Sequence, residues 1–382
     1  MFKITVKNND TEKSLTFSEP ILLSEALERF GINQHKPCGG KGICKKCMVT
    51  ANTKEVLACQ TYASDDTYID YNTNEGDIQG LKEGYMTFFD KQPLVTEGYG
   101  LAVDIGTTTI AGLLYKFPEC EIIESMAIAN TQAAYGADVI SRIEFSSSGG
   151  LDKLQKCAED QIEKLSCGYK IDKYVITGNT TMLHLLTGLD PASIAVAPYE
   201  PKTLFGFWQD NVFLPKCISA YVGADMTCAI LSSGILDDKT SFLVDIGTNG
   251  EMALWHGGTL VCCSTAAGPA FEGGVISQGT LAISGAIDKV FIENGEVKYT
   301  TIDDKKPIGV CGTGLIDAIS CMKNLGVLEE SGYLEEDFQI GNSGVYITAK
   351  DVRQVQLAKA AIRAGIDTLL HECNIDCAEI ER

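Results

Sequence analysis

The pentad VDIGT occurs twice in this sequence of 382 residues, and the repeat limits the fold more than any other feature. The first copy begins at Val103 inside GLAVDIGTTTIAGLLY, and the second begins at Val244 inside SFLVDIGTNGEMALWH. One Asp-x-Gly turn between apolar runs is ordinary hairpin chemistry. Two copies in the same context predict two related units, each with a strand, a tight turn and a second strand.

The residue types in both turns suit phosphate binding. Glycine lets the backbone approach a ligand, amide and threonine groups donate hydrogen bonds to phosphate oxygens, and an aspartate at the strand end can position Mg²⁺ through water. The predicted contacts are Asp104, Gly106, Thr107, Thr108 and Thr109 in the first turn, and Asp245, Gly247, Thr248 and Asn249 in the second. Two such turns that face each other would enclose the phosphates of a nucleotide, so ATP and Mg²⁺ are the predicted ligands.

A third glycine-rich segment, GVCGTGLIDAI, begins at Gly309. It places Gly312 and Gly314 directly before a predicted helix that contains Asp317. Two interpretations stay open: a contact with the nucleotide, or a plain loop in which glycine lets the helix start close to its neighbour. Both glycines are included among the predicted cofactor-binding residues.

Four of the fifteen cysteines stand apart because of their spacing. Cys38, Cys44 and Cys47 form a C-x5-C-x2-C pattern in PCGGKGICKKC, and Cys59 follows in VLACQT. Thiolates at this spacing can converge on two irons, and a glycine-rich loop lets amides turn toward the sulfurs, so we predict a 2Fe-2S cluster. A structural zinc site is the alternative, although it usually needs two C-x2-C pairs. The other eleven cysteines are interpreted as core or incidental thiols.

The segments around these cysteines predict a small sheet with one helix. Five segments have the pattern of strands: KITVK, SLTFS, CMVTA, EVLAC and TYIDY. One segment, LLSEALERFG, has the pattern of a helix that ends at Gly31. Residues 1–75 resemble the β-grasp ferredoxins, with the x5 spacing of their adrenodoxin-like branch. Residues 76–98 show no clear period and are interpreted as a linker.

The two pentads and the GVCGTG segment resemble the actin/Hsp70/acetate-kinase superfamily, whose two related subdomains each present one phosphate loop to a central cleft. The resemblance implies a ribonuclease H-like ATPase, with subdomain I at residues 99–236 and subdomain II, including a C-terminal helix, at residues 237–382. The predicted fold class is therefore α/β, with an α+β ferredoxin part at the N-terminus.

Ferredoxin and ATPase in one chain resemble the reductive activators of corrinoid proteins. Further matching stretches are YGADVISRI, VITGNTTMLHLL, VGADMTCAIL and AAGPAFEGG. The resemblance implies an ATP-dependent enzyme that passes one electron from its cluster to an inactive Co(II) corrinoid protein and so regenerates Co(I), with a low-potential electron donor as a second partner. Two other functions stay open: an electron-transfer ferredoxin with a degenerate ATPase scaffold, and a metabolite kinase-like enzyme with a regulatory cluster.

Two features depart from that family. Its members carry a middle domain between ferredoxin and ATPase, for which the linker here is too short, and they end with a strand and a small-residue loop that holds adenosine. Thr348 and Asp351 predict a capping box for a helix through about Glu372, and the family's next strand would begin at CAEIER. We therefore expect a truncated reading frame and weakened contacts to adenosine.

Glu251, just after the second turn, and Asp225 are the candidates for activating the attacking water. Each could equally cap a turn or remain in solvent, so the identity of the general base stays open. His184 and His256 are expected to pack against neighbours and not to ligate or catalyse.

Composition excludes several classes of partner. The formal net charge of −20 and the pI near 4.6 argue against a nucleic acid or an anionic membrane. The opening MFKITVKNND lacks the apolar segment of an export signal, and no apolar run is long enough to span a bilayer. The expected location is the cytoplasm, where cysteines remain thiols or bind metal. The oligomeric state stays open, with a homodimer as one option.

Overall fold

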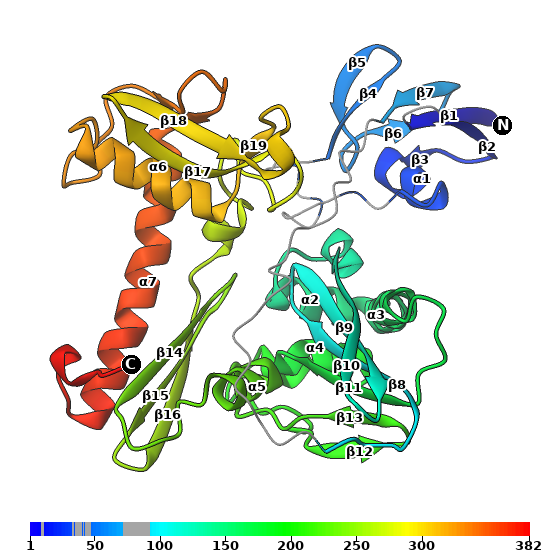
Figure 1. The fold of residues 1–382 in the computed structure, drawn as a ribbon. Coiled ribbons are helices and arrows are strands. Elements are labelled where there is room, and N and C mark those ends of the chain that lie inside the picture. Colours follow the sequence, from blue (N-terminus) through cyan, green and yellow to red (C-terminus); the bar gives the residue numbers. More distant parts are fainter. Residues whose placement is uncertain (9–10, 33, 35–39, 41, 43–46, 72–91) are drawn as a thin grey trace.

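The computed structural model of the chain describes residues 1–8, 11–32, 34, 40, 42, 47–71 and 92–382. These residues form one small sheet near the N-terminus and two larger α/β units that follow it (Figure 1). Among the described residues, no helix is both long and apolar enough to cross a membrane.

The N-terminal sheet has five strands in the order β2-β1-β7-β4-β5, with β1 and β7 parallel and the other neighbours antiparallel. Helix α1 buries Leu23, Ala26 and Leu27 in the same apolar cluster as Ile4 and Ile69 of the sheet, which is the β-grasp arrangement. The predicted strands and helix are confirmed. Their bounds are β1 (Phe2–Asn8), β2 (Thr11–Phe17), β3 (Ile21–Leu22), α1 (Leu23–Arg29), β4 (Met48–Ala51), β5 (Lys54–Leu57), β6 (Tyr62–Ala63) and β7 (Thr67–Asp70).

The next unit, at residues 98–233, is built on a six-stranded sheet in the order β10-β9-β8-β11-β13-β12. Strands β8, β9 and β10 form an antiparallel meander, and β11 pairs parallel to β8. Leu101 and Leu114 of the sheet share one apolar core with Leu154, Leu165 and Met182 of the helices. The elements are β8 (Gly98–Ile105), β9 (Thr109–Phe117), β10 (Glu121–Ala129), α2 (Val139–Phe145), α3 (Leu151–Leu165), β11 (Lys173–Gly178), α4 (Thr180–Leu186), β12 (Phe207–Gln209), β13 (Val212–Leu214) and α5 (Ala224–Ser233).

The third unit repeats the meander. Strands β14, β15 and β16 pair in order and antiparallel, and the second VDIGT ends β14 as the first ends β8, so the predicted internal repeat is confirmed. A second small sheet, β18-β17-β19, packs on α6. The elements are β14 (Ser241–Ile246), β15 (Gly250–His256), β16 (Thr259–Thr265), β17 (Ala286–Glu293), β18 (Glu296–Thr301), β19 (Gly309–Val310), α6 (Gly312–Asn324), β20 (Phe338–Gln339), β21 (Tyr346–Ile347) and α7 (Ala349–Cys373).

Helix α7 runs past both three-stranded sheets of this unit, as the red helix of Figure 1 shows. Its predicted capping box is confirmed, because the Thr348 N–H donates to Asp351 Oδ2 at 2.9 Å and the Asp351 N–H donates back to Thr348 Oγ1 at 3.3 Å. The second oxygen of Asp351 accepts from the Ser277 N–H at 2.7 Å. The helix start is therefore fixed to the loop that precedes β17.

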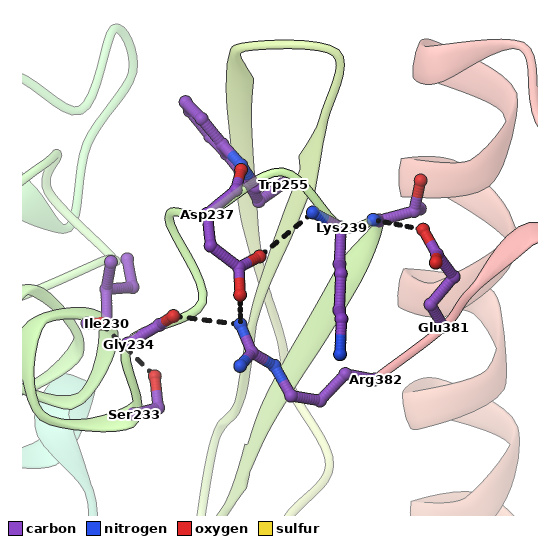
Figure 2. Close-up of polar contacts among 9 residues, drawn as sticks. Ile230, Ser233, Gly234, Asp237, Lys239, Trp255, Glu381 and Arg382 are labelled. Atoms are coloured by element: carbon purple, nitrogen blue, oxygen red, sulfur yellow. Dashed lines mark hydrogen bonds and ion pairs between the residues drawn. The ribbon is translucent and has the colours of Figure 1, made fainter. Parts of the chain in front are cut away.

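The segment between α5 and β14 joins the two α/β units and is held at several points (Figure 2). The Arg382 guanidinium donates to the Gly234 carbonyl at 2.8 Å and pairs with the Asp237 carboxylate at 3.0 Å. The Asp237 carboxylate also accepts from the Lys239 N–H at 2.9 Å, while its carbonyl accepts from Trp255 Nε1. The Lys239 amide and Arg382 lower the pKa of Asp237. The connection between the units is thus fastened to β15 and to residue 382.

The start of α6 lies so close to neighbouring backbone that it requires glycine. A Cβ at Gly312 would overlap the carbonyl oxygen of Phe271, and a Cβ at Gly314 would overlap that of Ile287. This packing is one of the two interpretations that the sequence left open for GVCGTG, and the structure supports it.

We predict that Gly312→Ala destabilises the protein by about 1–3 kcal/mol, because the added methyl must displace backbone in a packed site. Urea unfolding curves would measure the loss. Ser320→Ala, at an exposed position of the same helix, is the control and should not destabilise the protein, because alanine favours the helix more than serine does. Equal stability of the two variants would contradict the close packing described here.

Candidate nucleotide cleft and cluster site

The first VDIGT turn joins β8 to β9 and is tight. A Cβ at Gly106 would lie 2.7 Å from the Thr109 carbonyl oxygen, so the turn closes only around glycine. Three side chains hold it from behind. The Asn130 amide donates to the Gly106 carbonyl at 2.8 Å, Arg142 donates to the Thr107 carbonyl at 2.5 Å, and the Asn179 amide donates to Thr107 Oγ1 at 3.2 Å.

Arg142 is a fully buried cation directly behind this turn. Its guanidinium also donates to the Gly136 carbonyl at 2.9 Å and to Gln132 Oε1 at 3.2 Å. Burial lowers the pKa of Arg142 to about 10, which still leaves it charged at neutral pH. No role was predicted for Arg142 from the sequence, although YGADVISRI, which contains it, matches the corrinoid activators. A charged residue between the apolar Val139 and Ile143 of one helix was the available signal.

The second VDIGT turn joins β14 to β15 and is closed by its own backbone. The Gly247 N–H donates to the Asn249 carbonyl at 3.0 Å, and the Gly268 N–H donates to the Thr248 carbonyl at 2.8 Å. Asp245 therefore occupies the same position before its turn as Asp104 does before the first.

Four carboxylates influence one another in the cleft: Asp104, Asp225, Asp245 and Glu251. Glu251 is only 7% exposed and is the most strongly affected. Desolvation first, and then the charges of Asp225 and Asp245, raise the pKa of Glu251 to about 9. Desolvation is also the first cause of the raised pKa of Asp104 and of Asp225. The structure thus brings both candidate bases together with both strand-end aspartates.

A cation that binds directly to a protein needs several oxygen ligands close together. Within the described ranges, no group of three or more His, Cys, Asp or Glu side chains lies close enough to hold a metal ion. Mg²⁺ usually keeps several of its waters, and like charges without a counter-ion raise the energy of a buried site. The placement of Mg²⁺ by Asp104 and Asp245 through water stays a prediction.

Glu272 was not predicted, although its stretch AAGPAFEGG was quoted. Its Oε1 accepts from Thr108 Oγ1 at 2.9 Å, and its Oε2 accepts from Thr248 Oγ1. One carboxylate therefore contacts a hydroxyl of each VDIGT turn. A sequence separation of 164 residues from Thr108 explains why no local pattern revealed the contact.

The cysteine site is described in part. Cys38, Cys44 and Gly39 lie outside the described residues. Cys47 and Cys59 are buried at the open end of the β4–β5 hairpin, where the Ala58 N–H donates to the Cys47 carbonyl at 3.0 Å. The Gln60 amide donates to the Gly40 carbonyl at 2.5 Å and to the Cys59 carbonyl at 2.9 Å, so it ties the glycine-rich loop to Cys59. Two predicted ligands thus start from one rigid hairpin beside the predicted loop.

Of the two histidines considered in the sequence, His184 packs in the core and His256 is hydrogen-bonded to a neighbour. His184 is buried, with Nδ1 2.7 Å from the Thr180 carbonyl and its ring edge against Phe205, and burial lowers its pKa. His256 Nδ1 lies 2.9 Å from Thr240 Oγ1.

We predict that Glu251→Gln stabilises the metal-free protein increasingly as the pH rises. Because the folded protein holds this proton up to about pH 9 and the unfolded chain releases it near 4.5, the native protein loses stability over that range. The variant avoids the loss, with a gain of up to about 6 kcal/mol at pH 9. Thermal unfolding in EDTA from pH 4 to 9 measures it. Glu293→Gln, at an exposed residue of β17, is the control. A constant difference across the pH range would refute the burial of a proton on Glu251.

Comparisons with known proteins agree with this architecture. Residues 99–238 match the family described as the RACo middle region, and residues 239–382 match the C-terminal domain of RACo, the ASKHA domain. The boundary between the two matches falls in the fastened connection between the α/β units. The match at residues 99–238 overturns the expectation that this chain lacks the family's middle domain, because the region lies after the linker and includes the first VDIGT turn. The predicted limits of the ferredoxin and ATPase parts remain predictions.

Two curated relatives and one solved structure extend the match. The corrinoid activation enzyme RamQ of Eubacterium limosum is 28% identical over 502 positions, which cover 97% of this chain and 84% of RamQ. The [Co(II) methylated amine-specific corrinoid protein] reductase of Methanosarcina barkeri is 26% identical over 74% of this chain and 61% of its own length. The solved reductive activator for corrinoid,iron-sulfur protein is 27% identical, with a TM-score of 0.67 over 100% of this chain and 85% of that one.

The alignment with RamQ extends over 502 positions, 120 more than the 382 residues of this chain, so RamQ contains sequence without a counterpart here. The likeness to the solved activator nevertheless includes the ferredoxin-like sheet and both α/β units. Residues 99–382 therefore match the RACo middle region followed by the RACo ASKHA domain, and the chain as a whole resembles the reductive activators of corrinoid proteins.

Proposed function

We propose that this protein is an ATP-dependent reductive activator that delivers one electron to the inactive Co(II) form of a corrinoid protein and regenerates Co(I). The observation that carries the proposal is the presence, in one chain, of a cysteine-bearing β-grasp sheet and two facing VDIGT turns. The relatives named as corrinoid activation enzyme and corrinoid protein reductase support the choice of substrate.

For the redox half, we propose that Cys38, Cys44, Cys47 and Cys59 hold a 2Fe-2S cluster. When bound, such a cluster supplies one electron at about −400 mV in plant-type ferredoxins. Cys47 and Cys59 fit this role, because both are buried at one end of a hairpin and Gln60 donates to the Gly40 carbonyl beside them. The Co(II)/Co(I) couple typically lies lower still, so the transfer is uphill and needs a low-potential donor and a second source of free energy.

For the nucleotide half, we propose that Mg-ATP binds between the turns at Gly106–Thr109 and Gly247–Asn249. Arg142 fixes the first turn and adds buried positive charge behind it, while Asp104 and Asp245 attract the hydrated cation. ATP cannot push an electron directly. It can favour one arrangement of the two α/β units, and if that arrangement binds an easily reduced state of the corrinoid partner, hydrolysis drives the cycle.

Glu251 and Asp225 remain the proposed bases for the attacking water. Glu251 accepts a hydrogen bond from the Gly223 amide at the start of α5, and its raised pKa keeps a proton on it at neutral pH. Asp225, with a pKa raised to about 6, is the better acceptor at pH 7. We therefore favour Asp225 as the base that accepts the proton of the water, and Glu251 as the neighbouring group that positions Asp225.

We predict that anaerobically reconstituted protein contains about two irons and two sulfides per chain. Cys59→Ser should lose most of this iron and the visible absorbance, because one of four thiolate ligands is removed. Cys377→Ser, at an exposed thiol near the other end of the chain, is the matched control and should keep both. Colourless wild-type protein that instead binds zinc would refute the cluster.

We predict that reduced protein, a Co(II) corrinoid protein and Mg-ATP together give Co(I). A low-potential chemical donor keeps the protein reduced, and the absorbance of Co(I) measures the yield. Omitting ATP should lower the yield at least severalfold, because the downhill step that offsets the unfavourable transfer is missing. Asp245→Asn should behave like omission of ATP. Equal yields with and without Mg-ATP would refute the ATP half and leave a plain electron-transfer ferredoxin.

A further inference from the structure

The carboxylate of Glu272 lies between the two VDIGT turns and accepts one hydroxyl hydrogen bond from each. Thr108 Oγ1 donates to one oxygen at 2.9 Å, and Thr248 Oγ1 donates to the other. Thr108 follows β8 of one α/β unit, whereas Thr248 follows β14 of the next. Glu272 therefore connects the units at the point where the proposed phosphates bind.

The backbone around Glu272 is held in place. Glu272 ends the short 3-10 helix Pro269–Glu272, which has Gly268 before it and Gly273 after it, both with positive φ. Gly268 is hydrogen-bonded to the second turn, and the carbonyl of Phe271 touches the start of α6 so closely that Gly312 must be glycine. A change in the contacts of Glu272 would therefore be felt by α6.

Glu272 and a bound phosphate would compete for the same two hydroxyl protons, those of Thr108 and Thr248. A threonine hydroxyl has one proton, and a carboxylate offers only acceptors. While Thr108 and Thr248 donate to Glu272, neither can donate to a phosphate oxygen. The negative charge of the carboxylate would also repel a triphosphate bound between the turns.

From these contacts we infer that Glu272 is a positioning residue that acts as an internal anion. Glu272 accepts hydrogen bonds from the hydroxyls of both turns until a nucleotide phosphate replaces it as the acceptor. Once Glu272 is released, the 3-10 helix that carries it can shift against the start of α6. The inference rests on the proposed function, since it assumes that the cleft binds Mg-ATP. A residue that only ties the turns together would have the opposite effect on affinity, because its loss would disorder the binding site.

Titration calorimetry with Mg-ATP tests the sign of this effect. Glu272→Gln keeps the shape and one acceptor but removes the charge, and should bind Mg-ATP about tenfold more tightly than wild type, since a charge-assisted hydrogen bond no longer competes. Glu272→Ala is the second variant and should also bind more tightly. Glu330→Gln, an exposed residue of the same unit, is the control and should bind like wild type.

Amide hydrogen exchange without nucleotide gives a second readout. Residues 104–109 and 246–250 should exchange faster in Glu272→Gln than in wild type or Glu330→Gln, because the link between the turns is weakened. Unchanged exchange there, or affinity that is equal or weaker in both Glu272 variants, would overturn the inference and leave the proposed function intact. Wild-type protein that binds no Mg-ATP would instead overturn the nucleotide half of the proposed function.

Discussion

Four carboxylates lie near one another around the two VDIGT hairpins, and the rest of the structure must hold them there against their repulsion. Asp104, Asp225, Asp245 and Glu251 raise one another's energy, and desolvation adds to the cost. Such a site persists only if the packing around it outweighs the repulsion. Here the meanders β8–β10 and β14–β16, each with its own core, supply that packing. Perturbed carboxylates in a cleft are typical of functional sites, and a cation would remove the penalty.

Both units must therefore be placed correctly for one site to exist. Each contributes one turn, and they are joined by the segment between α5 and β14, which Arg382, Trp255 and Glu381 fasten. A ligand that contacts both turns can act on the arrangement of the units only through its different affinity for each arrangement. The hydrogen bonds of this connection oppose any rearrangement of the two units that breaks them. The free energy of ligand binding that is left to drive such a rearrangement is smaller by the cost of breaking these bonds.

Local patterns sufficed for the repeat, for the strands of the N-terminal sheet and for the capping box of α7, since each depends on neighbouring residues. They also found Asp225 and Glu251 as candidates. They could not find Asn130, Arg142, Asn179 or Glu272, whose partners lie far along the chain. Arg142 reads from the sequence as an ordinary helix residue. Only the fold shows that its charge is buried behind a turn more than thirty residues earlier.

The glycines of GVCGTG have two possible roles, contact with the nucleotide and close packing of α6. The sequence offered a nucleotide contact or a packing requirement, and the structure supplies the packing: Gly312 lies against Phe271, and Gly314 against Ile287. Phe271 directly precedes Glu272, which holds the hydroxyls of both turns. The glycines thus let α6 begin in contact with the 3-10 helix whose Glu272 contacts both turns. Their sensitivity to substitution follows from this contact, whether or not they ever meet the nucleotide.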